Sequence, residues 1–255
     1  MKKLLLLLPS LLLMISCTDD NNTAANEPII PEDNFIRAAD MSFLPLIESE
    51  NTTYFNSNNQ TENALTTLKN AGCNTIRIRL WKNPIDSQSS FNQVKTFAQR
   101  VKQAGMKVWL TVHYSDTWAD PGQQSIPTEW ENLSFTNLKN EVISYTETIM
   151  TEIQPDIIQI GNEINSGLMW PQGHLINNEN QCLELLNVAC STVRTQSPST
   201  KIMLHYAGIG AGATWFFNKM TSIPYDYIGL SYNQSAGKRY KLKLTFPSKI
   251  TPLSI

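Results

Sequence analysis

Short apolar segments alternate with longer amphipathic segments from Phe35 onward, and this alternation limits what the chain can fold into. It is typical of βα units arranged around a parallel sheet. We expect strands at residues 36–42, 75–81, 107–114, 156–163, 201–206 and 225–232. We expect helices at residues 62–71, 91–104, 135–153, 180–196 and 214–221, two of which should end at Gly72 and Gly105.

Polar and aromatic residues stand at the ends of several predicted strands, including Trp81, His113, Glu163 and His205. Catalytic groups of (β/α)8 barrels occupy such positions. A doubly wound sheet usually has a glycine-rich first turn, but residues 42–45 contain no glycine. The pattern therefore favours the α/β class and a (β/α)8 TIM barrel.

The length of the chain predicts an incomplete barrel. Five βα units occupy residues 34–224, so eight units need roughly 305 residues, in the upper part of the usual range. Residues 34–255 supply only 222. We expect about six strands and about five helices.

The first residues resemble a bacterial lipoprotein signal. Lys2 and Lys3 precede an apolar stretch that ends in Ser16 and Cys17, and this stretch is too short for an ordinary membrane-spanning helix. Residues 1–16 are predicted to be a signal peptide, Cys17 the lipidated residue, and the polar residues 17–33 a flexible tether. This predicts an exported lipoprotein of the outer membrane, on its periplasmic or cell-surface face. A plain secretory signal is the alternative.

Charge and cysteine usage exclude other classes of protein. Residues 1–232 carry 15 basic and 22 acidic side chains, a net charge of −7 (15 − 22), which argues against nucleic-acid binding. Cys73, Cys182 and Cys190 are an odd number and have no metal-ligand spacing. We expect a monomer without a cofactor or a metal ion.

Asn162 and Glu163 follow a buried strand and are the most informative pair in the sequence. Desolvation at the mouth of a barrel favours the protonated form of a carboxyl group, as general acid catalysis requires. Asn162 could hold a substrate hydroxyl, and Trp170 and His174 could line the same cleft. The alternative is a strand-end glutamate that pairs with an arginine for structural reasons.

Residues before and after this pair suit a sugar. Strict alternation places Arg77, Arg79 and Trp81 on one face of their strand, where the two arginines need anionic partners. His113 opens a loop rich in aromatic and hydrogen-bonding groups, which also contains Trp118. Sugars present apolar faces to rings and hydroxyls to polar groups.

Five segments together resemble the endo-β-1,4-galactanases of glycoside hydrolase family 53, and the resemblance extends over about residues 36–232. The segments are residues 39–42, 74–84, 112–121, 161–173 and 228–232. The resemblance implies a (β/α)8 barrel that cleaves galactan side chains of pectin by a retaining double displacement. It also implies Glu163 as the acid/base and, as substrate-binding residues, Asn162, Arg79, His113, Trp118, Trp170, His205 and Tyr232.

The sequence departs from the family after Tyr232. No glutamate follows Glu184, and Asp226 is the only later acidic residue, so the second catalytic carboxylate is missing. Residues 233–255 carry five basic and no acidic side chains, and residues 240–246 alternate like a strand. Either a frameshift near codon 233 replaced the end of an enzyme, or the chain is a genuine short protein. We expect residues 34–232 to be a partial glycosidase domain, residues 233–255 an atypical basic tail, and the chain to be inactive.

Three functions remain open at this point. The first is a lipid-anchored endo-β-1,4-galactanase acting on arabinogalactan. The second is a related barrel glycosidase acting on mannan or xylan, because specificity resides in loops. The third is a non-catalytic surface lipoprotein that binds a plant glycan.

Overall fold

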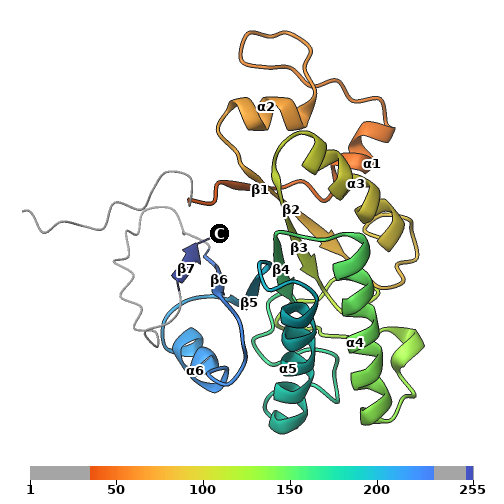
Figure 1. Cartoon of the computed structure of the whole chain (residues 1–255), viewed down its shortest axis with the longest axis vertical. Coiled ribbons are helices and arrows are strands. Elements are labelled where there is room, and N and C mark those ends of the chain that lie inside the picture. The colour runs from red at the N-terminus through yellow and green to blue at the C-terminus, as the bar shows by residue number, and fades with distance from the viewer. Residues whose placement is uncertain (1–34, 233–250, 255) are drawn as a thin grey trace, which may run out of the picture. The chain divides into compact units, whose positions relative to one another are not determined.

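The structure is a computed structural model that describes residues 35–232 and 251–254. In that part of the chain, seven parallel strands pair in their order along the sequence (Figure 1). The strands are β1 (Ala38–Asp40), β2 (Thr75–Leu80), β3 (Lys107–Val112), β4 (Ile157–Ile160), β5 (Lys201–Ala207), β6 (Tyr227–Ser231) and β7 (Thr251–Ser254). The predicted parallel βα architecture, an incomplete (β/α)8 barrel, is confirmed.

Helices connect the strands and cover one face of the sheet (Figure 1). They are α1 (Leu44–Ser49), α2 (Ala64–Asn70), α3 (Phe91–Gln103), η2 (Thr128–Trp130), α4 (Phe135–Glu152), α5 (Glu179–Gln196) and α6 (Ala211–Lys219). Gly72 and Gly105 follow α2 and α3 with φ angles of 93° and 72°, in the left-handed region that favours glycine. Both predicted helix ends are therefore confirmed.

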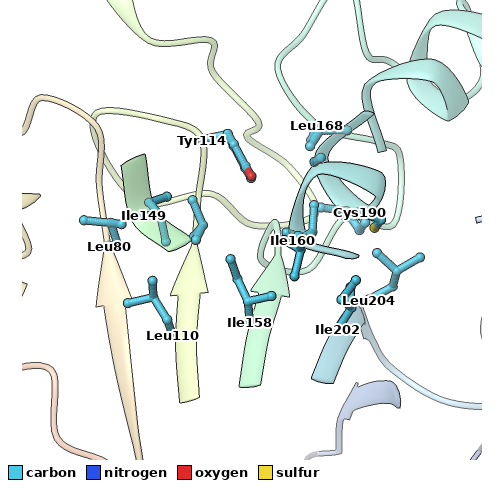
Figure 2. Packing of buried hydrophobic residues seen from close by; sticks show 14 of the residues in the cluster. Leu80, Leu110, Tyr114, Ile149, Ile158, Ile160, Leu168, Cys190, Ile202 and Leu204 are labelled. Atoms are coloured by element: carbon cyan, nitrogen blue, oxygen red, sulfur yellow. The ribbon is translucent and has the colours of Figure 1, made fainter. Parts of the chain in front are cut away.

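The main core lies between the strands and these helices. Figure 2 shows Leu80, Leu110, Ile158 and Ile202, one from each of four neighbouring strands, on the side that faces α4 and α5. These side chains are at most 1% exposed. Apolar side chains of this size each stabilise the fold by about 1.5–3 kcal/mol when fully buried.

The opposite face of the same strands forms the interior of the partial barrel. Because the strands are parallel and in register, Arg77 lies opposite Trp109, and Trp109 opposite Ile157. Trp109, Ile157 and Met203 make a second apolar cluster there. Polar residues such as Thr111, Gln159 and His205 occupy the positions further along β3, β4 and β5, so the interior changes from apolar to polar toward the carboxyl ends.

The structure differs from the sequence predictions at three places. Strand β4 ends at Ile160, since Gly161 and Glu163 have φ angles of 77° and 51° that are incompatible with a strand. Helix α1 was not predicted because six residues are too few to show a helical period. Strand β7 is a seventh strand, within the predicted basic tail, where Thr251 pairs with Tyr227 of β6.

Several predictions concern residues that the structure does not describe. They are the signal peptide at residues 1–16, the lipidation of Cys17, the tether at residues 17–33, and the strand-like alternation at residues 240–246. None of the helices within residues 35–232 is both long enough and apolar enough to cross a membrane.

Two isoleucines test the position of the core. Ile78 is a residue of β2 that is 1% exposed and belongs to the main core, whereas Ile85 is fully exposed in the loop after β2. Ile78→Ala should lower the free energy of unfolding by about 2–5 kcal/mol, because it leaves a cavity. Ile85→Ala should change it by less than about 0.5 kcal/mol. Urea denaturation of both variants measures this difference, and equal losses would contradict the assigned core.

Candidate active site

A cavity of about 360 Å3 opens at the carboxyl ends of β1 to β6. Every one of these strands, or the first three residues after it, contributes a lining side chain. The lining residues are Asp40, Phe43, Arg77, Arg79, His113, Trp118, Ala119, Asp120, Asn162, Glu163, His205 and Ser231. This is the end of a βα barrel at which catalytic groups are found.

Glu163 is held in this cavity through both its main chain and its side chain. Its N–H donates to His205 Nδ1 at 3.1 Å, and its Oε1 accepts from Ser231 Oγ at 2.7 Å. The left-handed φ of 51° is uncommon for a residue other than glycine, and such conformations cluster at functional sites. In the described part of the chain Glu163 forms no salt bridge, which removes the structural alternative of an arginine pair.

These hydrogen bonds determine the tautomer of His205. Because Nδ1 accepts from the Glu163 N–H, the neutral ring carries its proton on Nε2. Nε2 lies 3.0 Å from Ser231 Oγ, which therefore accepts from His205 and donates to Glu163. Burial, together with the charge of Arg77, lowers the pKa of His205 to about 3, so the ring is neutral at ordinary pH.

Asn162 belongs to a second group of buried hydrogen bonds. Its Oδ1 accepts from Arg77 Nη2 at 2.9 Å, and its Nδ2 donates to Ala119 O at 2.9 Å. Gln159 Nε2 lies 3.3 Å from the same Oδ1 and 3.2 Å from His205 Nδ1. Arg77 also pairs with Asp40, at 2.5 Å. The network thus fixes Asn162 beside Glu163.

Arg79 has a different environment from Arg77. Its guanidinium lies 4.7, 4.5 and 4.0 Å from the ring centroids of Phe43, Trp81 and Trp118. Its Nε donates to Ser89 Oγ at 3.1 Å, and among the described residues it forms no salt bridge. Burial lowers the pKa of Arg79, with the nearby Asp40 acting in the opposite direction. The predicted anionic partner is therefore present for Arg77 and absent for Arg79.

His113 supports the loop that forms the rim of the cavity. Its Nδ1 accepts from the Ala119 N–H at 3.0 Å, and its ring packs edge-on against Trp118 at 5.9 Å. Burial and the charges of Arg77 and Arg79 hold the pKa of His113 well below its usual range. Trp118 is 48% exposed, so part of its ring is free to meet a ligand.

Two of the eight predicted site residues, Trp170 and Tyr232, lie outside the cavity, and so does His174, which was expected to line the same cleft. Trp170 lines a neighbouring hollow because a parallel bridge joins it to Ser125 in the loop after β3. His174 stacks on Trp170 with ring centroids 4.9 Å apart and supports its own loop. Tyr232 follows β6 and is half-buried, but does not line the cavity. The other six line the cavity together.

Sequence reasoning missed Ser231, Asp40 and Gln124. Ser231 lies two residues after Gly229, so both point to the inner face of β6. Strand alternation could therefore have indicated Ser231, whereas the family motif indicated Tyr232. Asp40 ends the first strand, so it shows the same sequence signal as Glu163, a carboxylate at the carboxyl end of a strand. Gln124 donates to the carbonyl oxygens of Asn162 and Glu163 at 2.9 and 3.2 Å, and no local pattern marks it.

No group of three or more metal-ligating side chains occurs among the described residues. The residues that line the cavity offer carboxyl groups, hydroxyl and amide hydrogen bonds, and aromatic rings. Such a set suits proton transfer to a neutral, hydroxyl-rich ligand.

Comparison with known proteins identifies the family. Residues 36–248 match glycosyl hydrolase family 53. The chain belongs to this family. The match extends beyond Tyr232, where the similarity of motifs ended, into the region predicted as an atypical tail.

Relatives within family 53 have similar sequences and structures. The chain is 35% identical over 214 residues to the arabinogalactan endo-β-1,4-galactanase A of Aspergillus niger, covering 77% of this chain and 60% of that one. The family 53 catalytic domain of Ignisphaera aggregans superposes with a TM-score of 0.75 at 35% identity, over 80% of this chain and 61% of that one. A fungal β-1,4-galactanase gives a TM-score of 0.72 at 31% identity, over 76% and 63%. The chain thus spans about three fifths of the length of these relatives.

The pKa of His205 predicts a pH dependence of stability. The pKa is about 3 in the folded chain against 6.5 for an ordinary histidine, so the unfolded chain binds more protons between these values. The contribution of His205 is therefore fully present above pH 6.5 and is lost as the pH falls toward 3. In urea denaturation across this range, the free energy of unfolding should fall less with decreasing pH for His205→Gln than for the wild type. An equal fall in both proteins would contradict the buried neutral imidazole.

Proposed function

We propose that this family 53 chain provides the substrate cleft and the acid/base residue of an endo-acting β-1,4-galactanase. The observation that carries the proposal is the placement of Glu163 inside the cavity, with Oε1 held by Ser231 and the main chain held by His205. A positioned carboxyl group within reach of the leaving oxygen is what glycoside hydrolysis requires.

In the proposed reaction, Glu163 acts as general acid and then as general base. Ser231 occupies Oε1, so Oε2 faces the glycosidic oxygen and gives it a proton as the bond to the anomeric carbon breaks. Retention of configuration requires a second carboxylate about 5–5.5 Å away, which attacks that carbon and is later displaced by water. Glu163 then takes the proton from this water.

This 255-residue polypeptide can cleave galactan only if one of its residues supplies the second carboxylate. Asp226 precedes β6 and pairs with Arg194, at the end of the strand opposite to the cavity. Asp40 and Asp120 line the cavity, but Asp40 pairs with Arg77 and Asp120 accepts from the Gly122 N–H. These contacts support a second candidate function, in which the protein holds a glycan without cleaving it; its anchoring as a lipoprotein is a separate proposal.

Galactan is the proposed ligand rather than mannan or xylan. The support is the relationship to the Aspergillus niger arabinogalactan endo-β-1,4-galactanase A and to the fungal β-1,4-galactanase structure. Trp118 and His113 supply apolar and polar groups at the rim. The same relationship supports arabinogalactan as the natural polymer.

Titration with tetrasaccharides tests the ligand. We expect the 255-residue polypeptide to bind β-1,4-galactotetraose more tightly than mannotetraose or xylotetraose, and to release no reducing sugar from galactan. Trp118→Ala should weaken galactotetraose binding about three- to tenfold through lost stacking. The matched control is Trp215→Ala, since Trp215 is 43% exposed on α6 and lines neither cavity. Isothermal titration calorimetry and a reducing-sugar assay measure both properties.

Two outcomes would contradict these expectations. Tighter binding of mannotetraose or xylotetraose would reassign the ligand. Turnover of galactan that Glu163→Gln abolishes would support the acid/base role of Glu163 but contradict the expected inactivity, and would show that another group serves as the nucleophile.

We also propose that the protein is an outer-membrane lipoprotein anchored through Cys17. The support is the sequence of residues 1–17, with two lysines, an apolar stretch and a terminal Ser-Cys pair. In cells fed an alkyne fatty acid, the wild type should take up the label and move with outer membranes, and Cys17→Ser should do neither. Equal labelling of Cys17→Ser would rule out this anchor.

A further inference from the structure

The turn that carries Glu163 leaves the sheet before the neighbouring strand ends. Strand β4 ends at Ile160, whereas β5 continues to Ala207 and pairs with β6 as far as Ser231. The three strands lie side by side (Figure 1). In the part of the chain that the structure describes, the last residues of β5 therefore have a strand on one edge only. Their N–H and C=O groups on the other edge need partners of another kind.

The side chain of Asn165 supplies these partners at Ala207. Its Oδ1 accepts from the Ala207 N–H at 2.8 Å, and its Nδ2 donates to Ala207 O at 2.9 Å. In a parallel ladder, a neighbouring strand makes both of these hydrogen bonds with its main chain. A single side-chain amide thus replaces the missing strand at this position, and we call this pair of hydrogen bonds the Asn165–Ala207 contact.

The turn before Asn165 has an unusual main-chain conformation. Gly161 and Glu163 have left-handed φ angles of 77° and 51°. A Cβ atom at residue 161 would lie 2.4 Å from Ile164 Cγ2, so this position requires glycine. Glu163 has a Cβ atom, and its left-handed conformation persists only where surrounding contacts hold it.

Asn165 is one of the residues that hold Glu163 in this conformation. The Asn165 N–H donates to Glu163 O at 2.8 Å, which closes a tight turn around Ile164. The side chain of Ile164 is fully buried in the main core. Because the turn is so short, a displacement of Asn165 moves the main chain of Glu163.

Ala207 connects this turn with Ser231. Ala207 lies opposite Ser231 in the register of β5 and β6, and the Gly208 N–H donates to Ser231 O at 3.0 Å. Asn165 therefore holds one edge of Ala207, and the strand of Ser231 holds the other edge. The hydrogen bond of 2.7 Å from Ser231 Oγ to Glu163 Oε1 joins the same two elements. It depends on the Asn165–Ala207 contact, which fixes the distance between them.

We propose that Asn165 is a positioning residue for Glu163, and that its amide keeps the carboxyl group in the active-site cavity and within reach of Ser231. Asn165 does not line the cavity, so it acts through Glu163 and not by contact with a ligand. The inference rests on the proposed function, because it takes Glu163 as the acid/base residue.

Nuclear magnetic resonance of the 15N-labelled 255-residue chain tests this role. In the wild type, a scalar coupling through the hydrogen bond should connect the Glu163 amide nitrogen with His205 Nδ1, and the Ala207 N–H should exchange slowly with solvent. Asn165→Ala should abolish the coupling and speed the exchange of the Ala207 N–H about five- to tenfold, because both hydrogen bonds to the side chain are lost. Asn165→Asp keeps an acceptor and loses the donor, so it should abolish the coupling with a smaller change in exchange.

The affinity for β-1,4-galactotetraose measures the consequence for the site. Asn165→Ala should weaken binding about three- to tenfold, because Glu163 is displaced. The matched control is Asn187→Ala, since Asn187 is exposed on α5 and does not line the cavity. It should change neither the affinity nor the coupling. Circular dichroism of each variant establishes that it is folded.

The outcomes separate this inference from the proposed function. If the Asn165 variants keep the coupling and bind galactotetraose like the wild type, Asn165 only stabilises the sheet and the inference is wrong, while the proposed function stands. A wild-type Ala207 N–H that exchanges as fast as exposed loop amides would overturn the inference even if neither variant folds. If Asn165→Ala loses the coupling but the wild type binds no galactotetraose, the positioning role stands and the proposed function fails.

Discussion

Two hydrogen bonds between the turn after β4 and His205 are the contacts on which the site depends. The Glu163 N–H donates to His205 Nδ1, and the Ile164 N–H donates to the main-chain oxygen of the same residue at 3.0 Å. Both hold the left-handed turn at Glu163, and the first fixes the histidine tautomer. The orientation of Ser231 toward Glu163 follows from that tautomer, because Nε2 then carries the proton.

The cost of burying polar groups explains why this arrangement is so closely connected. Gln159, Asn162 and His205 are at most 8% exposed, and each would be destabilising without a partner. Parallel register brings them together from neighbouring strands, and they satisfy one another and Arg77. Two arginine nitrogens are exceptions among the described residues, because Arg77 Nε and Arg79 Nη2 are buried without a partner. Three aromatic rings surround the Arg79 guanidinium. Cation–π contacts offset part of that cost.

The division of the interior into layers links the fold to the function. Trp109, Ile157 and Met203 fill the amino-terminal half of the interior with apolar groups. This cluster supports the polar layer above it, and the cavity and the adjacent hollow lie at the carboxyl ends of the strands. Sugar recognition is thereby confined to loops that follow the strands, and these loops can vary while the core is kept.

The sequence by itself determined the βα order, the two faces of β2, the placement of Glu163, His113 and His205 at strand ends, and the family. These features depend on local periodicity and on short motifs, which are contained in neighbouring residues. The tertiary structure alone decided which side chains meet. Ser231 and Gln124 reach Glu163 from 68 and 39 residues away, and Trp170 turns into a separate hollow because of a bridge to Ser125. Contacts of such separation follow from strand register and loop packing, which no local pattern encodes.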